Sequence, residues 1–276
     1  MFQGTITAMV TPFREGRLDE AALRDQVEFQ IGSGIDGLSP AGTTGEAPTL
    51  SGAEHARLIE LTIQFAHGRV PVIPGVGSNS TSHAIELHSL AKRLGATAAL
   101  SVTPYYNRPT QEGMFRHFLA LADAVELPIV LYNVPSRTGT NLLPATVARL
   151  STHKHIVAIK EAGGAVDQAA EIMSRCEITV LSGDDALTLP MISIGAQGVV
   201  SVASNLVPKE MVAMTRRALA GEFGPAREIH RRLAPLIRSL FLDGNPAGIK
   251  CAMSLAARDS GELRLPLCGV SESTRA

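Results

Sequence analysis

The stretch PIVLYNVPSRTGTNLLPATVARLSTHKHIVAIKE, residues 128–161, decides the fold. It begins and ends with short apolar runs, PIVLYNV (128–134) and HIVAIKE (155–161), and residues 145–150 between them carry apolar side chains at helical spacing. Continuous apolar runs of this length are typical of strands covered on both faces, as in a parallel sheet. The stretch therefore predicts a strand, a helix and a second, parallel strand.

The same alternation continues in both directions along the chain. The other predicted strands are TITAMV (5–10), GLSPA (37–41), VPVIPGV (70–76), ATAALSV (96–102), ITVLSG (178–183) and GVVSVAS (198–204). The other predicted helices between the strands are 18–31, 53–66, 82–94, 111–125 and 165–174. Eight such units predict an α/β protein, a (β/α)8 TIM barrel.

An open doubly wound sheet is the alternative, but no GxGxxG follows the first strand. The polar and glycine-rich motifs instead follow the carboxyl ends of successive strands, which form one rim in a barrel. After GEFG (221–224) only helical patterns remain, over 225–243 and 245–261. We therefore expect a catalytic barrel over 1–223 and a small C-terminal helical appendage over 224–276.

Composition excludes several classes of function. The formal net charge of the 276 residues is −1 and no basic run is present, so we expect no nucleic-acid or membrane partner. The three cysteines form no CxxC pair, which argues against a disulfide framework or a zinc site. No apolar stretch approaches about 18 residues, and the N-terminus lacks signal-peptide features. A cytoplasmic location is expected.

Lys160 is the strongest candidate for a nucleophile. It alone among the five lysines follows an apolar strand; the other four, Lys250 among them, lie in predicted helices or turns and are expected to be solvated. Burying an unpaired ammonium is costly, which favours the neutral amine that attacks a ketone. The structural alternative is a lysine that extends to solvent from the strand end or pairs with Glu161.

The loop AGTTGE (41–46) directly follows the second predicted strand. Its glycines flank Thr43 and Thr44, so backbone N–H groups and hydroxyls can be presented together in a tight turn. Such a loop leading towards a helix suits a carboxylate or a phosphate. The alternative is a plain glycine-rich turn with threonine caps.

All three tyrosines of the chain lie at or just past the ends of predicted strands. Tyr105 and Tyr106 lie in TPYYNRP (103–109) and Tyr132 ends the fifth strand. A phenol at this rim can move protons when its hydroxyl is bonded to another member of a relay. Any one of them is more simply a packed ring with a satisfied hydroxyl, but three on one predicted face favour a functional cluster.

Two further loops supply charged residues to the same rim. Arg137 lies in NVPSRTG (133–139), and its planar guanidinium suits a carboxylate, although a surface arginine is the simpler interpretation. In SGDDA (182–186) we interpret Asp184 and Asp185 as turn and helix-cap residues, because no His or further acid stands at metal-ligand spacing. No metal site is expected.

In this order the motifs resemble those of the dihydrodipicolinate synthase family, in the group of pyruvate-dependent class I aldolases that includes N-acetylneuraminate lyase. The resemblance covers nearly the whole chain and rests on AGTTGE, TPYYNRP, LYNVPSRTG, IKEA, LSGDDA and GVVSV. It implies a lysine Schiff base without metal or organic cofactor. Pyruvate would form the imine with Lys160, with Thr43 and Thr44 holding its carboxylate and backbone groups of Gly183 and Val200 lining the pocket.

The resemblance also implies a proton relay of Thr44, Tyr132 and Tyr106. The tyrosine at the position of Tyr106 comes from a neighbouring subunit in the family, so a homo-oligomer is implied, with a tetramer built from dimers as the expected form. Arg137 matches the residue that receives the carboxylate of the aldehyde substrate, and sugar-acid lyases typically lack it.

The implied reaction condenses pyruvate with L-aspartate-4-semialdehyde to give 4-hydroxy-tetrahydrodipicolinate, in the diaminopimelate and lysine biosynthesis route. Two alternatives stay open. One is another pyruvate-dependent aldolase or lyase, of the 2-keto-3-deoxy sugar acid or N-acetylneuraminate type. The other is a non-catalytic pyruvate-binding paralogue, because NPAGIK (245–250) replaces the family's NPxPVK and the chain ends at LPLCGVSESTRA, where relatives usually continue through another helix.

The family's feedback site for lysine is only partly matched. His55, Asn79 and Tyr105 match it, but Gly52 replaces a His and His83 replaces a Glu. A glutamate there would face the ammonium of the effector, and an imidazole cannot supply that negative charge. We therefore predict weak or absent inhibition by lysine.

Overall fold

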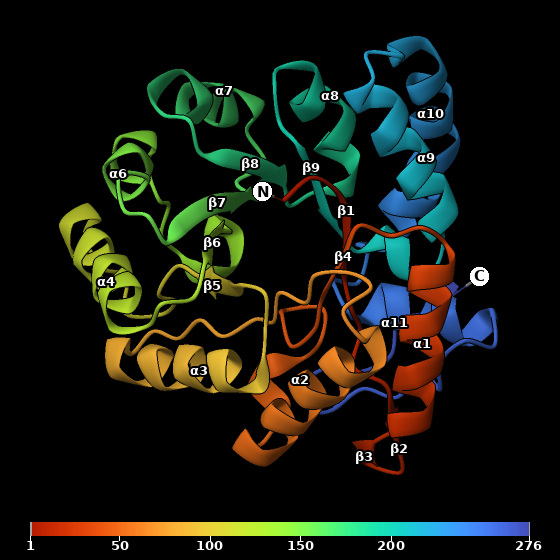
Figure 1. Cartoon of the computed structure of the whole chain (residues 1–276). Coiled ribbons are helices and arrows are strands. Elements are labelled where there is room, and N and C mark those ends of the chain that lie inside the picture. The colour runs from red at the N-terminus through yellow and green to blue at the C-terminus, as the bar shows by residue number, and fades with distance from the viewer. Residues whose placement is uncertain (1, 276) are drawn as a thin grey trace.

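The centre of the protein is a parallel sheet of seven strands that curves into a cylinder (Figure 1). The computed structural model describes residues 2–275. The strands are β1 (Gly4–Ala8), β4 (Gly37–Ser39), β5 (Ala99–Val102), β6 (Ile129–Asn133), β7 (Ile156–Glu161), β8 (Thr179–Ser182) and β9 (Gly198–Ser201). Their order is β4-β1-β9-β8-β7-β6-β5. All neighbours are parallel, so every carboxyl end lies on one rim.

The remaining gap, between β4 and β5, is filled by the segment predicted as the third strand. Residues 70–76 form no regular ladder and make only two isolated bridges, Leu38 to Val72 and Gly75 to Leu100. The prediction of a full strand is wrong here, because Pro71 and Pro74 have no N–H to donate. The segment still closes the cylinder, and the predicted (β/α)8 barrel is confirmed.

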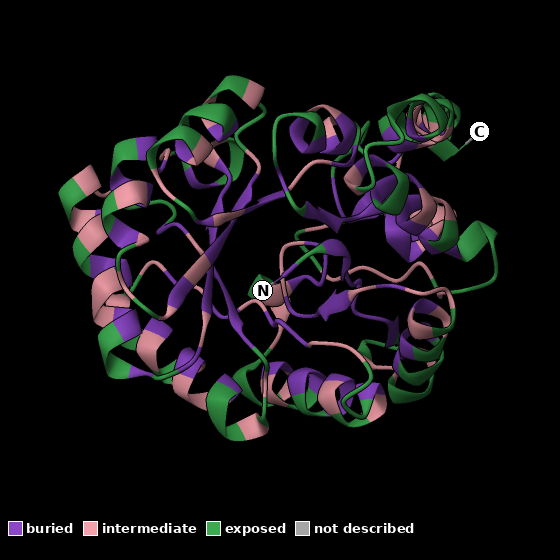
Figure 2. Cartoon of the chain, turned by 45° about the horizontal axis from the view of Figure 1, so that its top comes forward, coloured by how far each residue is buried: buried purple, intermediate pink, exposed green. Residues whose placement is uncertain are grey.

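Helices surround the cylinder (Figure 1). Those of the barrel are α1 (Glu20–Gly32), α2 (Gly52–Ala66), α3 (Thr81–Leu94), α4 (Gln111–Ala124), α6 (Pro144–Leu150), α7 (Val166–Arg175), α8 (Thr188–Ser193) and α9 (Pro208–Leu219). Each presents its apolar face to the strands and its polar face to solvent, as the burial colours of Figure 2 show. A strand-to-helix connection therefore crosses the rim in every unit.

Short elements occupy the loops at the ends of the strands. The hairpin β2 (Phe13–Arg14) and β3 (Arg17–Leu18) follows β1, and α5 (Pro135–Thr138) follows β6. Three single 3-10 turns are η1 (Ala47–Thr49), η2 (Asp185–Leu187) and η3 (Ala203–Asn205). These turns, η1 after β4, η2 after β8 and η3 after β9, keep the loops at the rim short.

The C-terminal helices are α10 (Phe223–Ser239), α11 (Ala247–Leu255) and α12 (Glu272–Arg275). Leu233 of α10 and Ile249 of α11 share one apolar cluster with Val199 of β9 and Met211 of α9. The start of α11 is thereby held beside the rim of the barrel. Within residues 2–275, no helix is both long enough and apolar enough to span a membrane.

Candidate active site

Lys160 and Tyr132 stand side by side on neighbouring strands. They are register partners on β7 and β6, and the Lys160 Nζ lies 4.2 Å from the centroid of the Tyr132 ring. Lys160 is only 6% exposed, and among residues 2–275 no carboxylate forms a salt bridge with it. The structure therefore holds an amine in a mostly buried place, against an aromatic ring, without a counter-charge.

Glu161 does not supply that counter-charge. Successive residues of a strand face opposite sides, and the Glu161 carboxylate accepts hydrogen bonds from Asn133 Nδ2 at 3.0 Å, Gly163 N at 2.6 Å and Gln168 Nε2 at 3.1 Å. Burial raises the pKa of this carboxyl against the lowering effect of its donors. The alternative that Lys160 pairs with Glu161 is wrong, and the network fixes the end of β7 instead.

The remaining expected pocket residues of the barrel interior lie beside Lys160. A Cβ added to Gly183 would lie 3.1 Å from Lys160 Cε and 2.5 Å from the Cβ of Ala162, so the glycine leaves space for the lysine stem. Val200 is buried in the same interior cluster as Tyr132. The structure thus brings Lys160, Tyr132, Gly183 and Val200 together, as the sequence predicts.

The AGTTGE loop contributes the hydroxyl of Thr44, which is bonded to a residue outside the barrel strands. Thr44 is buried and Thr43 half-buried. The Oγ1 of Thr44 accepts a hydrogen bond from Asn245 Nδ2 at 3.0 Å. Gly45 makes the loop tight, since an added Cβ would lie 2.9 Å from the backbone N of Ala41. The loop therefore presents Thr44 in one fixed orientation.

Arg137 is tied to the same asparagine. It lies in α5, is largely exposed, and its Nη2 donates to the backbone oxygen of Asn245 at 3.1 Å. Asn245 itself is 8% exposed. Sequence reasoning missed this residue: NPAGIK (245–250) was notable only as a departure from a family pattern, and nothing in its local spacing indicates a contact about 200 residues away.

Lys250 is the second buried lysine, so the expectation that it is solvated is wrong. Its Nζ lies 2.6 Å from Glu46 Oε1 and 2.6 Å from the backbone oxygen of Glu262, over the ring of Phe13. Both charged side chains are completely buried. This lysine has a carboxylate partner and two hydrogen-bond acceptors, whereas no such partner is found for Lys160 among residues 2–275, which separates a structural lysine from a candidate nucleophile.

Tyr106 does not reach the pocket within one chain. It is 90% exposed, and its backbone has a positive φ of 72° that is rare for tyrosine. The neighbouring Tyr105 is 40% exposed, and its backbone oxygen accepts from Asn79 Nδ2 at 3.1 Å. The predicted contribution of Tyr106 from a neighbouring subunit stays a prediction.

The residues expected at a remnant effector site lie on one side of the rim. The Nε2 of His55 lies 2.9 Å from the Gly75 oxygen, and burial lowers the pKa of its imidazole against the raising effect of this hydrogen bond. His83 itself is exposed and 3.2 Å from Glu86 Oε2. A Cβ added to Gly52 would meet open space, so a larger side chain would fit at this position.

Asp184 and Asp185, which follow β8, accept hydrogen bonds from backbone N–H groups. The Oδ2 of Asp185 accepts from the N–H groups of Val202 and Ala203, both at 3.0 Å, and Asp184 Oδ1 accepts from Ala186 N. The interpretation as a cap residue is confirmed for Asp184, which caps η2, whereas Asp185 does not cap its own turn and instead ties η2 to the loop after β9. Among residues 2–275, no three His, Cys, Asp or Glu side chains are grouped as metal ligands would be.

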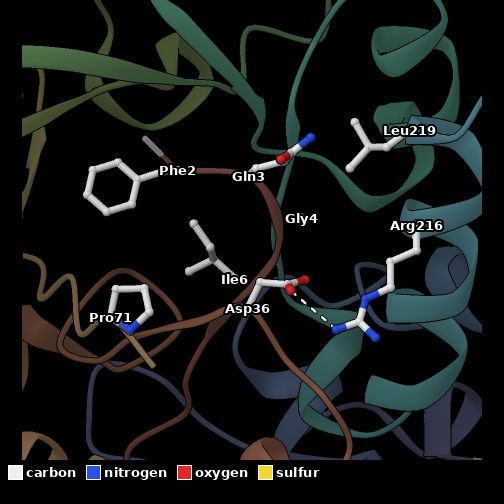
Figure 3. Close-up of a pocket in the computed structure, with 8 residues that line it drawn as sticks. All are labelled: Phe2, Gln3, Gly4, Ile6, Asp36, Pro71, Arg216 and Leu219. Carbon is white, nitrogen blue, oxygen red and sulfur yellow. Dashed lines mark hydrogen bonds and ion pairs between the residues drawn. The ribbon is translucent and has the colours of Figure 1, made fainter. Parts of the chain in front are cut away.

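A cavity of about 530 Å³ lies at the opposite end of the barrel (Figure 3). It opens around Gly4, the first residue of β1, and its charged side chains, Asp36 and Arg216, are paired with each other at 3.3 Å. No candidate site residue lines it. The chemistry therefore belongs to the rim, in agreement with where barrel enzymes place their active sites.

Comparison with known proteins assigns the chain to a family. The dihydrodipicolinate synthetase family matches residues 1–276. The 4-hydroxy-tetrahydrodipicolinate synthase of Geotalea daltonii is 52% identical, over 100% of this chain and 96% of the relative. The solved synthase of Methylacidiphilum fumariolicum SolV has a TM-score of 0.98 at 48% identity, covering 99% of this chain and 92% of the other.

A further solved structure is the chloride-inhibited dihydrodipicolinate synthase of Acinetobacter baumannii, complexed with pyruvate. It has a TM-score of 0.98 at 42% identity and covers 100% of this chain and 95% of the other. With the family matched over the whole chain and relatives above half identity, the chain belongs to the dihydrodipicolinate synthetase family.

Proposed function

We propose that this protein is a 4-hydroxy-tetrahydrodipicolinate synthase, a lyase that condenses pyruvate with L-aspartate-4-semialdehyde in the diaminopimelate and lysine route. Its curated relatives at 52–53% identity carry that name. The observation that carries the proposal is Lys160, a buried amine without a counter-charge beside Tyr132. This is the environment that an imine-forming lysine needs.

The reaction begins at the Lys160 Nζ. The neutral amine attacks the keto carbon of pyruvate. The keto oxygen leaves as water, with one proton from the amine and one from the proton relay, so an iminium remains, with the Thr43–Thr44 turn against the substrate carboxylate. Loss of a proton from the methyl carbon gives an enamine. That carbon then bonds to the aldehyde carbon of the second substrate, whose oxygen takes up a proton. The amino group of the second substrate then attacks the regenerated iminium carbon, closes the ring and displaces Lys160 as the free amine. The imine carries the chemistry, so neither metal nor organic cofactor is required.

The side chains around Lys160 divide the remaining tasks. Thr44, Tyr132 and the Tyr106 of a neighbouring subunit pass the protons, because hydroxyl groups can both donate and accept. Arg137 holds the carboxylate of the aldehyde substrate through its planar guanidinium. We further propose that the protein assembles into a homotetramer and that it is located in the cytoplasm.

The imine is tested by reductive trapping. Protein incubated with pyruvate and reduced with borohydride is expected to gain the mass of one reduced pyruvate adduct per chain, on the peptide that contains Lys160. The Lys160→Ala variant gains none, whereas Lys92→Ala, which removes an exposed lysine on α3, gains the full adduct. Absence of the adduct in the wild type, or its persistence in Lys160→Ala, overturns the proposal.

The aldehyde is tested separately with Arg137→Ala. Because the substrate carboxylate loses its partner, the KM for aspartate semialdehyde is expected to rise by about 10-fold or more while imine trapping is unchanged. An unchanged KM in Arg137→Ala would show that Arg137 does not hold the carboxylate of the aldehyde substrate, and the choice of aspartate semialdehyde over other aldehydes would lose its support from this residue.

A further inference from the structure

Asn133 and Glu161 lie directly behind the candidate nucleophile, on the outer face of the same two strands. Tyr132 on β6 pairs in register with Lys160 on β7, and the next pair along the strands is Asn133 with Glu161. Because side chains alternate along a strand, the first pair faces the interior of the cylinder and the second faces the helices. We propose that Asn133 and Glu161 are positioning residues. The hydrogen bond between their side chains clamps β6 to β7 and sets the Tyr132 ring against the Lys160 amine.

The amide of Asn133 has one arrangement in this clamp. Its Oδ1 accepts from the backbone N–H of Leu142 at 2.9 Å, so its Nδ2 faces the Glu161 carboxylate and donates to Oε2 at 3.0 Å. The same Nδ2 donates to Asn141 Oδ1 at 2.8 Å. Asn133 is completely buried and Glu161 is 2% exposed. A buried polar group without its partner costs free energy, so the two side chains hold one another in this arrangement.

Glu161 is also anchored to the helix that follows β7. Its carboxylate accepts from Gly163 N at 2.6 Å and from the Nε2 of Gln168, on α7, at 3.1 Å. A Cβ added to Gly163 would lie 2.6 Å from Glu161 Oε1, so the glycine permits this close approach. All of these partners are hydrogen-bond donors, and a carboxylate accepts through both oxygens. The clamp thus ties the end of β6 to a carboxylate that α7 already holds.

The ladder between β6 and β7 is irregular at the end remote from the site. Its register shifts between Ile129 and Val130. A slip of one residue turns every side chain of a strand to the opposite face, which would carry Lys160 or Tyr132 out of the interior. Within residues 2–275, the clamp is the one side-chain hydrogen bond between these two strands. It stands one residue beyond the Lys160–Tyr132 pair, so the relative position of amine and ring depends on it.

The inference rests on the proposed function, and the rate of imine formation tests it. Asn133→Ala removes the clamp and leaves Lys160 and Tyr132 unchanged. The protein is mixed with saturating pyruvate, quenched with borohydride at increasing times and weighed. The fraction of chains trapped at long times counts the folded sites, and the rate constant reports how well each site is aligned. We expect the rate constant to fall by about 10-fold, because small misplacements of reacting groups slow a reaction strongly.

Substitutions around the same carboxylate separate the clamp from its surroundings. Glu161→Ala breaks the bond from the side of β7 and should slow imine formation by at least as much. The conservative Glu161→Gln keeps an oxygen that can accept from Asn133, so its rate constant should stay within about 3-fold of the wild type. The matched control is Gln168→Ala, which removes another donor to Glu161 but leaves the clamp. Its rate constant should stay within about 2-fold of the wild type, since this hydrogen bond stabilises the fold without aligning the site.

A role in packing alone gives a different result: fewer chains would be trapped, each at the wild-type rate constant. That result for Asn133→Ala and Glu161→Ala, or equal slowing by Gln168→Ala, would overturn the inference. A wild type that traps no pyruvate would instead defeat the proposed function, and that measurement comes before any variant is compared.

Discussion

At the scale of single residues, the protein contains two buried lysines with opposite surroundings. Lys250 has the Glu46 carboxylate at 2.6 Å, while Lys160 faces the Tyr132 ring without a carboxylate partner among the described residues. A buried charge is tolerated when it is paired, and removing one member leaves the other buried and uncompensated. The presence or absence of a carboxylate partner, more than the depth of burial, distinguishes the structural lysine from the candidate nucleophile.

This contrast predicts opposite effects of one substitution at the two positions. Lys250→Met should lower the free energy of unfolding by about 3–5 kcal/mol, because the buried Glu46 carboxylate loses its only ion-pair partner among the described residues. Lys160→Met should abolish imine formation but change the free energy of unfolding by less than about 1 kcal/mol. Urea unfolding at neutral pH measures both. A Lys250→Met protein as stable as Lys160→Met would show that the Glu46 pair contributes nothing.

At the scale of elements, helices α3 and α4 each carry one buried histidine, and the histidine of α4 bonds to α3. The Nδ1 of His88 lies 2.7 Å from the Ala84 oxygen, and that of His117 lies 2.9 Å from Thr81 Oγ1. Both Nε2 atoms are buried without a partner among residues 2–275. Burial lowers the pKa of each imidazole to about 4, and for His117 the charge of His88 adds to the effect.

The pair predicts a loss of stability in mild acid. The unfolded chain takes up protons on these imidazoles near pH 6.5, and the folded protein only near pH 4. Between those values the unfolded state binds more protons, so the free energy of unfolding falls as the pH falls and levels off below about 4. Each histidine contributes at most about 3 kcal/mol to this fall.

Urea unfolding between pH 7 and pH 4.5 measures this slope. His117→Leu should flatten it by about half, whereas His67→Asn, at the exposed end of α2, should leave it unchanged. Equal slopes in wild type and His117→Leu would show that other groups carry the acid sensitivity.

Sequence patterns predicted the elements best where each element carries its own signal. Apolar runs predict seven strands of the barrel correctly. The run at 70–76 predicts an eighth regular strand that does not form, because Pro71 and Pro74 interrupt the ladder. Lys160, Tyr132 and Gly183 could be placed together because the ends of parallel strands meet. The contacts of Asn245 and Lys250 could not, since both depend on how the segment before and within α11 folds back on the rim.

At the scale of the whole molecule, the loops around Tyr105 and Tyr106 present exposed aromatic surface beside the candidate effector residues. Tyr106 is exposed by 90%, and Asn79 holds the backbone of Tyr105. A proton-relay tyrosine in such a position needs a partner surface, which a second copy of the chain supplies in the proposed oligomer. Substrate turnover and effector binding would then share one interface.

The altered effector positions predict a protein insensitive to lysine. With open space at Gly52 and an imidazole at His83, half-inhibition should require lysine well above millimolar. Gly52→His combined with His83→Glu should lower that concentration, since the ammonium gains a carboxylate. Steady-state rates at rising lysine concentration measure both proteins. Half-inhibition of the wild type below millimolar would contradict the prediction.

The proline-interrupted segment at 70–76 is hydrogen-bonded to both of its neighbours, to Leu38 on one side and to Leu100 on the other, but it forms no continuous ladder. The regular ladders run from β5 through β9 to β4, and Lys160 and Tyr132 stand within them. The loop with Thr43 and Thr44 follows β4, and the tyrosine loop follows β5, so these two loops lie on either side of the irregular segment. The candidate nucleophile thus stands within the regular ladders, while the loops that would meet substrate and a neighbouring subunit in the proposed oligomer flank the one irregular wall of the cylinder.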